Sequence, residues 1–195
     1  MVQYKAITSH AKVSGDAILA MVEGLGAFKN FAVQILEENG IKDPQKDQWY
    51  LQQSWLDAFK IIAEKVGPNT LYNIGTKIPE NAKWPPHVDT IEKALGSIDV
   101  AYHMNHQIDN EVLFNPNTGE MKEGIGHYGF EKIGEKQVKM VCNNPYPCDF
   151  DRGIISNTAV IFNKDEKKYP KVAHDDSGSC RNKGDNACNY IVSWY

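Results

Sequence analysis

The chain has 195 residues, which is enough for one domain with a sizeable hydrophobic core. Hydrophobic residues make up 42% of it and charged residues 24%, a balance that argues against wholesale disorder or a fibrous repeat. With a formal net charge of −4, the sequence shows no clustered basic face of the kind that binds DNA or RNA.

The sequence also lacks the signals of a membrane or secreted protein. No run approaches the roughly 18 apolar residues of a membrane span, and the first ten residues contain no apolar signal-peptide core. We therefore expect a cytoplasmic protein. Four cysteines in a reducing compartment favour metal binding over disulfides wherever the thiols cluster.

The first half of the sequence predicts helices. From Ser14 to Asn39, apolar residues recur every three or four positions, which predicts one long helix that Ser14 caps and Gly40 stops. The apolar stripe of this helix, Ile18–Leu36, is longer than one small sheet covers. It therefore suggests the contact surface of a homodimer.

Three further helices are predicted by the same spacing of apolar residues. The first covers Leu51–Val66 and ends at Gly67-Pro68, and a shorter one begins with Asn69 as its cap and closes near Pro79. The last follows the rigid Trp84-Pro85-Pro86 segment and covers Val88–Tyr102.

The second half of the sequence predicts strands. Tyr128–Ile133 and Lys136–Cys142 fit a hairpin that turns at Gly134. Alternation from Cys188 to Trp194 predicts a strand that pairs with the segment Val172–Cys180. We therefore expect one α+β domain spanning residues 1–195, with N-terminal helices packed on an antiparallel sheet and a cysteine-bearing C-terminal hairpin.

All four cysteines lie in the C-terminal third. Cys180 and Cys188 flank a tight polar turn, so a hairpin would bring their thiols together. Cys148 follows the stiff segment Pro145-Tyr146-Pro147, whereas Cys142 ends the predicted strand before it. The spacing differs from the usual zinc knuckle, so both a metal site and unrelated buried cysteines fit the sequence.

Two segments, Asn144–Gly153 and Cys180–Val192, resemble the vinyl-4-reductase family. This resemblance implies an α+β fold similar to that of trafficking-complex subunits and of the sensor domains of phenol-responsive regulators. It also favours a helix for the ambiguous segment Gly153–Phe162. In that family three cysteines and one carboxylate hold a zinc ion beside a mostly apolar ligand pocket.

Carried onto this chain, the resemblance assigns the three thiolates to Cys148, Cys180 and Cys188. Ser177 occupies the position of the family's acid, so the fourth ligand needs another residue. The candidates are Cys142, Asp175, Asp176 and His174. We favour Cys142 because a thiolate is the softer ligand. A site closed by four protein ligands would make the zinc structural.

The expected ligand pocket lies between the helix Val88–Tyr102 and the sheet, away from the zinc. Tyr102, Tyr128 and Phe130 are its expected aromatic walls, and His103 or His106 its polar anchor.

These expectations describe a protein that binds or senses a small apolar or aromatic molecule. An alternative is an enzyme or carrier that acts on a tetrapyrrole or vinyl-bearing substrate, with haem as a possible cofactor beside His103, His106 and His127. Against an enzyme, the sequence has no nucleotide fingerprint to supply hydride. An assembly or scaffold protein is the third candidate.

Overall fold

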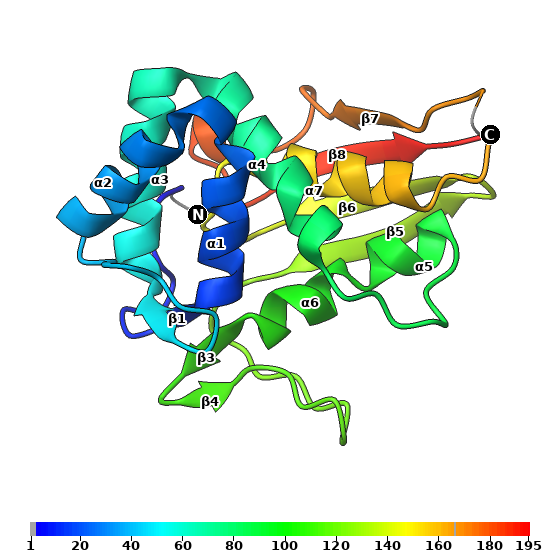
Figure 1. Cartoon of the computed structure of the whole chain (residues 1–195). Coiled ribbons are helices and arrows are strands. Elements are labelled where there is room, and N and C mark those ends of the chain that lie inside the picture. Colours follow the sequence, from blue (N-terminus) through cyan, green and yellow to red (C-terminus); the bar gives the residue numbers. More distant parts are fainter. Residues whose placement is uncertain (1–2, 166) are drawn as a thin grey trace.

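A four-stranded antiparallel sheet forms the C-terminal half of the protein in a computed structural model that describes residues 3–165 and 167–195 (Figure 1). The strands run in the order β5-β6-β8-β7, where β5 is Tyr128–Gly134, β6 Gln137–Cys142, β7 Lys171–His174 and β8 Cys188–Ser193. Both predicted hairpin partners, β5 with β6 and β7 with β8, pair antiparallel. The prediction of an α+β fold with a cysteine-bearing C-terminal hairpin is confirmed.

Helices from the first half of the chain build the other part of the core. They are α1 (Gly15–Gly24), α2 (Lys29–Glu38), α3 (Gln52–Val66) and α4 (Pro68–Asn81), with a 3₁₀ turn at Gly26–Phe28. The single long helix predicted from Ser14 to Asn39 is therefore wrong. The chain bends by 114° at Gly26, whose φ of +49° favours glycine.

This bend also removes the reasoning behind the predicted dimer surface. Ile18 and Met21 of α1 and Ile35 and Leu36 of α2 are buried in the protein's own core. Because α1 packs against α4, α2 packs against α3 and the two short helices also contact each other, the apolar stripe has intramolecular partners.

The expected helix Val88–Tyr102 forms as two pieces, α5 (Ile91–Gly96) and α6 (Ile98–Met104). Directly after α6 the chain enters a second sheet that the sequence did not predict. Its strands run in the order β2-β1-β3-β4, where β1 is Lys12–Ser14, β2 Trp49–Leu51, β3 His106–Ile108 and β4 Glu111–Val112.

Helix α7 (Cys148–Ile161) crosses α4 at two glycines. A Cβ atom added at Gly153 would lie 2.2 Å from the carbonyl oxygen of Tyr72, and one at Gly75 would lie 2.2 Å from the carbonyl oxygen of Phe150. The absence of side chains at these two positions lets the helix backbones touch. This crossing fixes α7, which carries residues of both candidate sites described below.

Within the described ranges 3–165 and 167–195, no single helix is long and apolar enough to cross a membrane. Only the pair formed by α1 and the segment Gly26–Glu38 meets the length and composition test together, and that pair is sharply bent.

Candidate functional site

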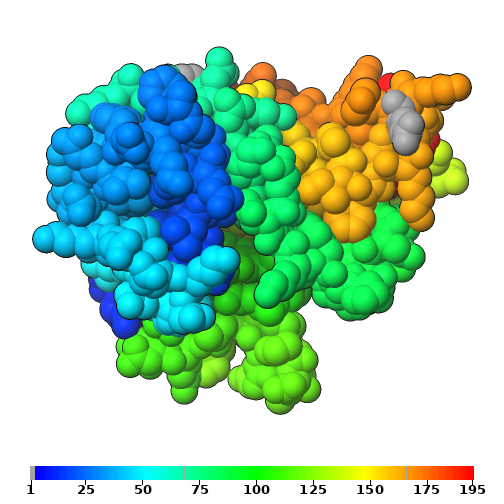
Figure 2. All heavy atoms as spheres, viewed as in Figure 1, coloured from blue at the N-terminus to red at the C-terminus, as the bar shows by residue number. Residues whose placement is uncertain are grey.

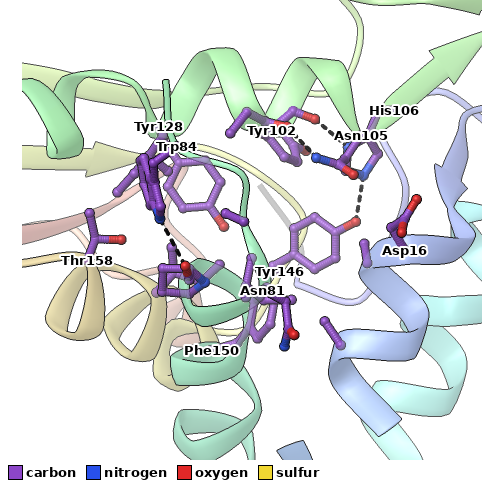
Figure 3. Close-up of a pocket in the computed structure, with 18 of the residues that line it drawn as sticks. Asp16, Asn81, Trp84, Tyr102, Asn105, His106, Tyr128, Tyr146, Phe150 and Thr158 are labelled. Carbon is purple, nitrogen blue, oxygen red and sulfur yellow. Dashed lines mark hydrogen bonds between the residues drawn. The ribbon is translucent and has the colours of Figure 1, made fainter. Parts of the chain in front are cut away.

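A cavity of about 140 Å³ opens between α6 and β5 on one side and α1, α4 and α7 on the other. The face in Figure 2 is hollowed between blue α1 and the green segments that follow α4. Aromatic side chains from five parts of the chain line the cavity: Trp55, Trp84, Tyr102, Tyr128, Tyr146 and Phe150. Figure 3 labels all of these except Trp55.

His106 is the buried histidine of this cavity. Its Nδ1 lies 2.7 Å from the carbonyl oxygen of Tyr102, and its Nε2 lies 2.7 Å from the hydroxyl of Tyr146. Burial lowers the pKa of His106 to about 4, so the ring is neutral at physiological pH. With the carbonyl taking the Nδ1 proton, Nε2 is the acceptor for Tyr146.

Thr158 supplies the other notable polar group of the pocket. Its Oγ1 is buried and has no hydrogen-bond partner among the described residues. In contrast, the Tyr102 hydroxyl donates to the carbonyl of Ile125 at 2.8 Å, and the Tyr128 hydroxyl donates to Asp151 at 2.6 Å. The cavity wall is therefore mostly apolar, with the unpartnered Thr158 hydroxyl packed within it and Asp16, Asn81 and Asn105 as further polar side chains.

The structure separates the predicted pocket residues. Tyr102, His106 and Tyr128 line the cavity, whereas Phe130 and His103 do not. His103 follows Tyr102 on α6 and is fully buried, but its ring packs against the ring of His127 and not into the cavity. Sequence reasoning missed Tyr146 and Phe150, although both stand beside the singled-out Cys148.

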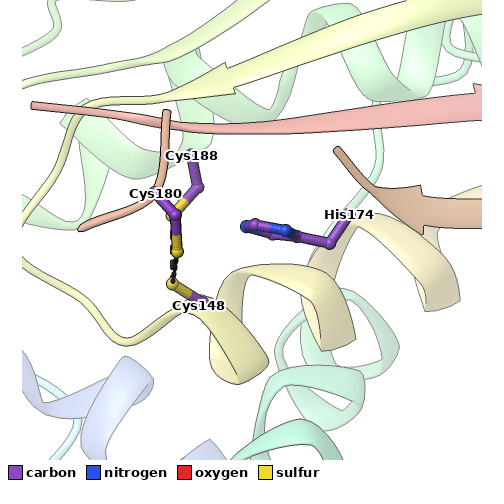
Figure 4. Close-up of side chains that lie close together, drawn as sticks. All are labelled: Cys148, His174, Cys180 and Cys188. Carbon is purple, nitrogen blue, oxygen red and sulfur yellow. Dashed lines mark hydrogen bonds between the residues drawn. The ribbon is translucent and has the colours of Figure 1, made fainter. Parts of the chain in front are cut away.

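A second candidate site lies where β7, β8 and the start of α7 meet (Figure 4). The sulfur of Cys148 lies 3.0 Å from that of Cys188 and 3.9 Å from that of Cys180, and Cys180 and Cys188 are 4.0 Å apart. Zn–S bonds of about 2.3 Å in a tetrahedron would separate sulfurs by about 3.8 Å. The three thiols are free and buried, so their arrangement is close to that of a zinc centre.

His174 completes this group. One of its ring nitrogens lies within 4.8 Å of all three sulfurs. Its Nδ1 lies 2.9 Å from a carboxylate oxygen of Asp176, and its Nε2 is buried without a hydrogen-bond partner among the described residues. A carboxylate on one ring nitrogen, with the other nitrogen facing the ligand position, is the usual arrangement of a metal-binding histidine.

The register of the sheet explains why His174 reaches the thiols. His174 lies opposite Tyr190, and side chains of directly opposed residues share one face. Cys188 is two residues from Tyr190 and therefore points to that same face. Of the four candidate fourth ligands, the structure places His174 beside the sulfurs, with Asp176 behind it. Cys142 and Asp175 are outside the group.

Arg181 makes the thiol cluster electropositive on one side. Its Nε and its backbone nitrogen each lie 3.4 Å from the Cys188 sulfur. Hydrogen bonds from the Cys148 thiol and then from Arg181 lower the pKa of Cys188, so this sulfur is the thiolate of the cluster. The guanidinium also pairs with buried Asp151, which accepts the Tyr128 hydroxyl of the pocket.

Solved structures resemble this fold over 93% of the chain. One is an H-NOX protein from S. oneidensis in an Fe(II)NO ligation state. The TM-score is 0.64 at 14% sequence identity, and the match covers 99% of that protein. Another is an oxygen-binding H-NOX domain related to soluble guanylate cyclases. The TM-score is 0.59 at 14% sequence identity, and the match covers 94% of that domain. At this identity the similarity defines the fold as H-NOX-like and no more.

No family model matches the chain, and no curated protein matches it. The resemblance to the vinyl-4-reductase family is therefore wrong, because the fold is similar to H-NOX domains instead. The quoted motif consists of two cysteines across a polar turn and a third before a helix. Such features occur wherever three thiols come together, for example at zinc sites of unrelated folds, so they do not identify one family.

Proposed function

We propose that this chain is a ligand-sensing domain that binds a small molecule in the aromatic cavity and a zinc ion at the thiol cluster. The observation that carries the ligand part is the cavity of about 140 Å³ with the unpartnered Thr158 hydroxyl in its wall. A dry cavity of about 150 Å³ is known to take up benzene. A neutral one-ring molecule with one hydrogen-bonding group suits this site.

Zinc fits the residues at the other site. Cys148, Cys180 and Cys188 would supply sulfur and His174 would supply Nε2, the buried atom that otherwise lacks a partner. A Cys₃His shell leaves no open position, so the ion would tie β7 and β8 to α7 rather than take part in catalysis. Metal binding would then contribute to the free energy of folding.

A haem or another tetrapyrrole is the second candidate ligand, because the similar structures include H-NOX proteins and studies of their haem. The neutral Nε2 of His106 and the aromatic walls favour it. The size and the charge of the cavity argue against a haem. Sites for larger ligands measure about 300–1,000 Å³, and the lining residues include no lysine or arginine to pair with propionates. The described residues therefore do not fit a haem.

Native mass spectrometry and an absorption spectrum of the purified protein test the proposal. We expect about one zinc per chain at the thiol cluster, no haem absorption band, and a rise of the melting temperature with phenol or indole as probe. Haemin binding that gives a haem band and is lost in His106→Ala would select the second candidate. Protein without zinc, or with no response to either phenol or indole, would contradict the corresponding part.

A further inference from the structure

We propose a second metal site, formed by Asp99, His103 and His127 on the outer side of α6, for a divalent transition-metal ion. It lies outside both the thiol cluster and the aromatic cavity. A carboxylate oxygen of Asp99 and one ring nitrogen of each histidine lie within 4.8 Å of one another. Small side-chain rotations bring such a set around one ion.

Helix geometry places the first two ligands together. Asp99 and His103 are four residues apart on α6, so they share a face of the helix. That face points away from the cavity, which Tyr102 and His106 line. His127 comes from the segment that leads into β5, and its ring lies against that of His103 with 5.0 Å between centroids.

Each of these side chains is oriented by a further group. The backbone N–H of Tyr128 donates to Asp99 Oδ1 at 2.8 Å, which fixes the carboxylate. The other carboxylate oxygen lies 2.9 Å from His127 Nδ1, and Glu123 holds His127 Nε2 at 2.8 Å. A histidine between a ligand position and an outer carboxylate is the arrangement that metal sites use to orient imidazole. His174 and Asp176 repeat it at the thiol cluster.

His103 carries an independent sign of a missing ligand. The side chain is fully buried, its Nδ1 lies 2.8 Å from the carbonyl of Asp99, and its Nε2 has no partner among the described residues. A buried polar atom left without a hydrogen bond costs free energy. The Nδ1 also lies 3.5 Å from Asp99 Oδ1, so the ring already contacts the carboxylate of the proposed site, and an ion bound at Nε2 would give that buried nitrogen a partner.

The donor set indicates the class of ion. Two imidazoles and a carboxylate suit Fe²⁺, Co²⁺, Ni²⁺ or Zn²⁺, whereas Mg²⁺ and Ca²⁺ prefer all-oxygen shells. His127 is 30% exposed and Glu123 77% exposed, which gives an ion and its water ligands a path from solvent. Three protein ligands leave positions open, unlike the closed thiol cluster.

Cobalt(II) distinguishes the two sites, since only thiolate ligands give sulfur-to-cobalt charge-transfer absorption. We expect metal-stripped wild type to bind about two cobalt ions per chain, one with that absorption and one without it. The variant His127→Asn should lose only the ion without the charge-transfer band. His10→Asn is the matched control, because His10 also faces a carboxylate, Asp109 at 3.3 Å, but lies on the surface away from the cluster.

A second variant keeps the test independent of the proposed zinc centre. Cys180→Ser should lose the charge-transfer band and keep the other ion. If that variant does not fold, His127→Asn with all its cysteines intact still tests whether the second metal site exists. A single bound cobalt with thiolate absorption in wild type would refute the second site, as would equal cobalt content in His127→Asn and wild type. Absence of the sulfur-to-cobalt charge-transfer band, with the other cobalt ion still bound, would refute only the proposed zinc centre.

Discussion

The neutral, buried His106 makes stability depend on pH in a calculable way. In the folded protein burial lowers its pKa from 6.5 to about 4, whereas the unfolded chain keeps the ordinary value. Between those two pH values the unfolded chain takes up a proton that the folded protein refuses. The contribution of His106 to stability is therefore present above pH 6.5 and is lost as the pH falls toward 4.

The size of the effect follows from the shift. Each pKa unit corresponds to about 1.4 kcal/mol, so His106 alone should lower the free energy of unfolding by about 2 kcal/mol between pH 7 and pH 5, and by about 3 kcal/mol at pH 4. His106→Gln removes the titration and keeps an amide that can serve both hydrogen bonds. The other carboxylates and histidines titrate alike in both proteins, so their contribution cancels in the difference.

Urea unfolding at a series of pH values measures this difference. We expect the free energy of unfolding of wild type, relative to that of His106→Gln, to fall by about 2 kcal/mol between pH 7 and pH 5. Parallel pH curves for the two proteins would refute the reasoning. They would mean that His106 is either accessible to water or charged in the folded state.

Three other substitutions probe the packing, each by urea or thermal unfolding. Arg181→Met leaves Asp151 buried without its partner and should cost about 3–5 kcal/mol; unchanged stability would contradict a buried ion pair. Gly153→Ala places a methyl group against the carbonyl of Tyr72 and should destabilise by more than about 2 kcal/mol, unlike an ordinary glycine-to-alanine change in a helix. Thr158→Val should keep or raise stability while weakening phenol binding; a loss above about 1 kcal/mol would reveal a hydrogen bond at that hydroxyl.

Periodicity predicted most of the helices and both hairpins because it reports which face is buried. It could not report the bend at Gly26, since α1 and α2 bury the same kind of stripe on either side of it. The strands β1 to β4 have only two or three residues each, which is too short for alternation to show. They form from tertiary pairing rather than from local preference.

The candidate sites divide in the same way. The turn between Cys180 and Cys188 is local, so the sequence alone predicted that their thiols lie close together. His174 was one of the four candidates for the fourth ligand. The choice of His174 depends on the register of β7 against β8, which a shift of one residue would reverse. Pairs such as Asp151 with Arg181, or Asp99 with His127, are thirty or so residues apart and have no local signal.

Helix α7 joins the thiol cluster to the aromatic cavity. Cys148 begins the helix within the cluster, Phe150 and Ile154 follow in the cavity wall, and Thr158 lies about one turn beyond Ile154. Because Cys148 and Phe150 lie in the same first turn of the helix, we expect a displacement of Cys148 to move Phe150 in the cavity wall as well. Loss of the thiols would therefore weaken ligand binding even if no thiol touched the ligand. Thr158→Val, which changes the wall and leaves the thiols intact, separates binding in the cavity from the integrity of the proposed zinc centre.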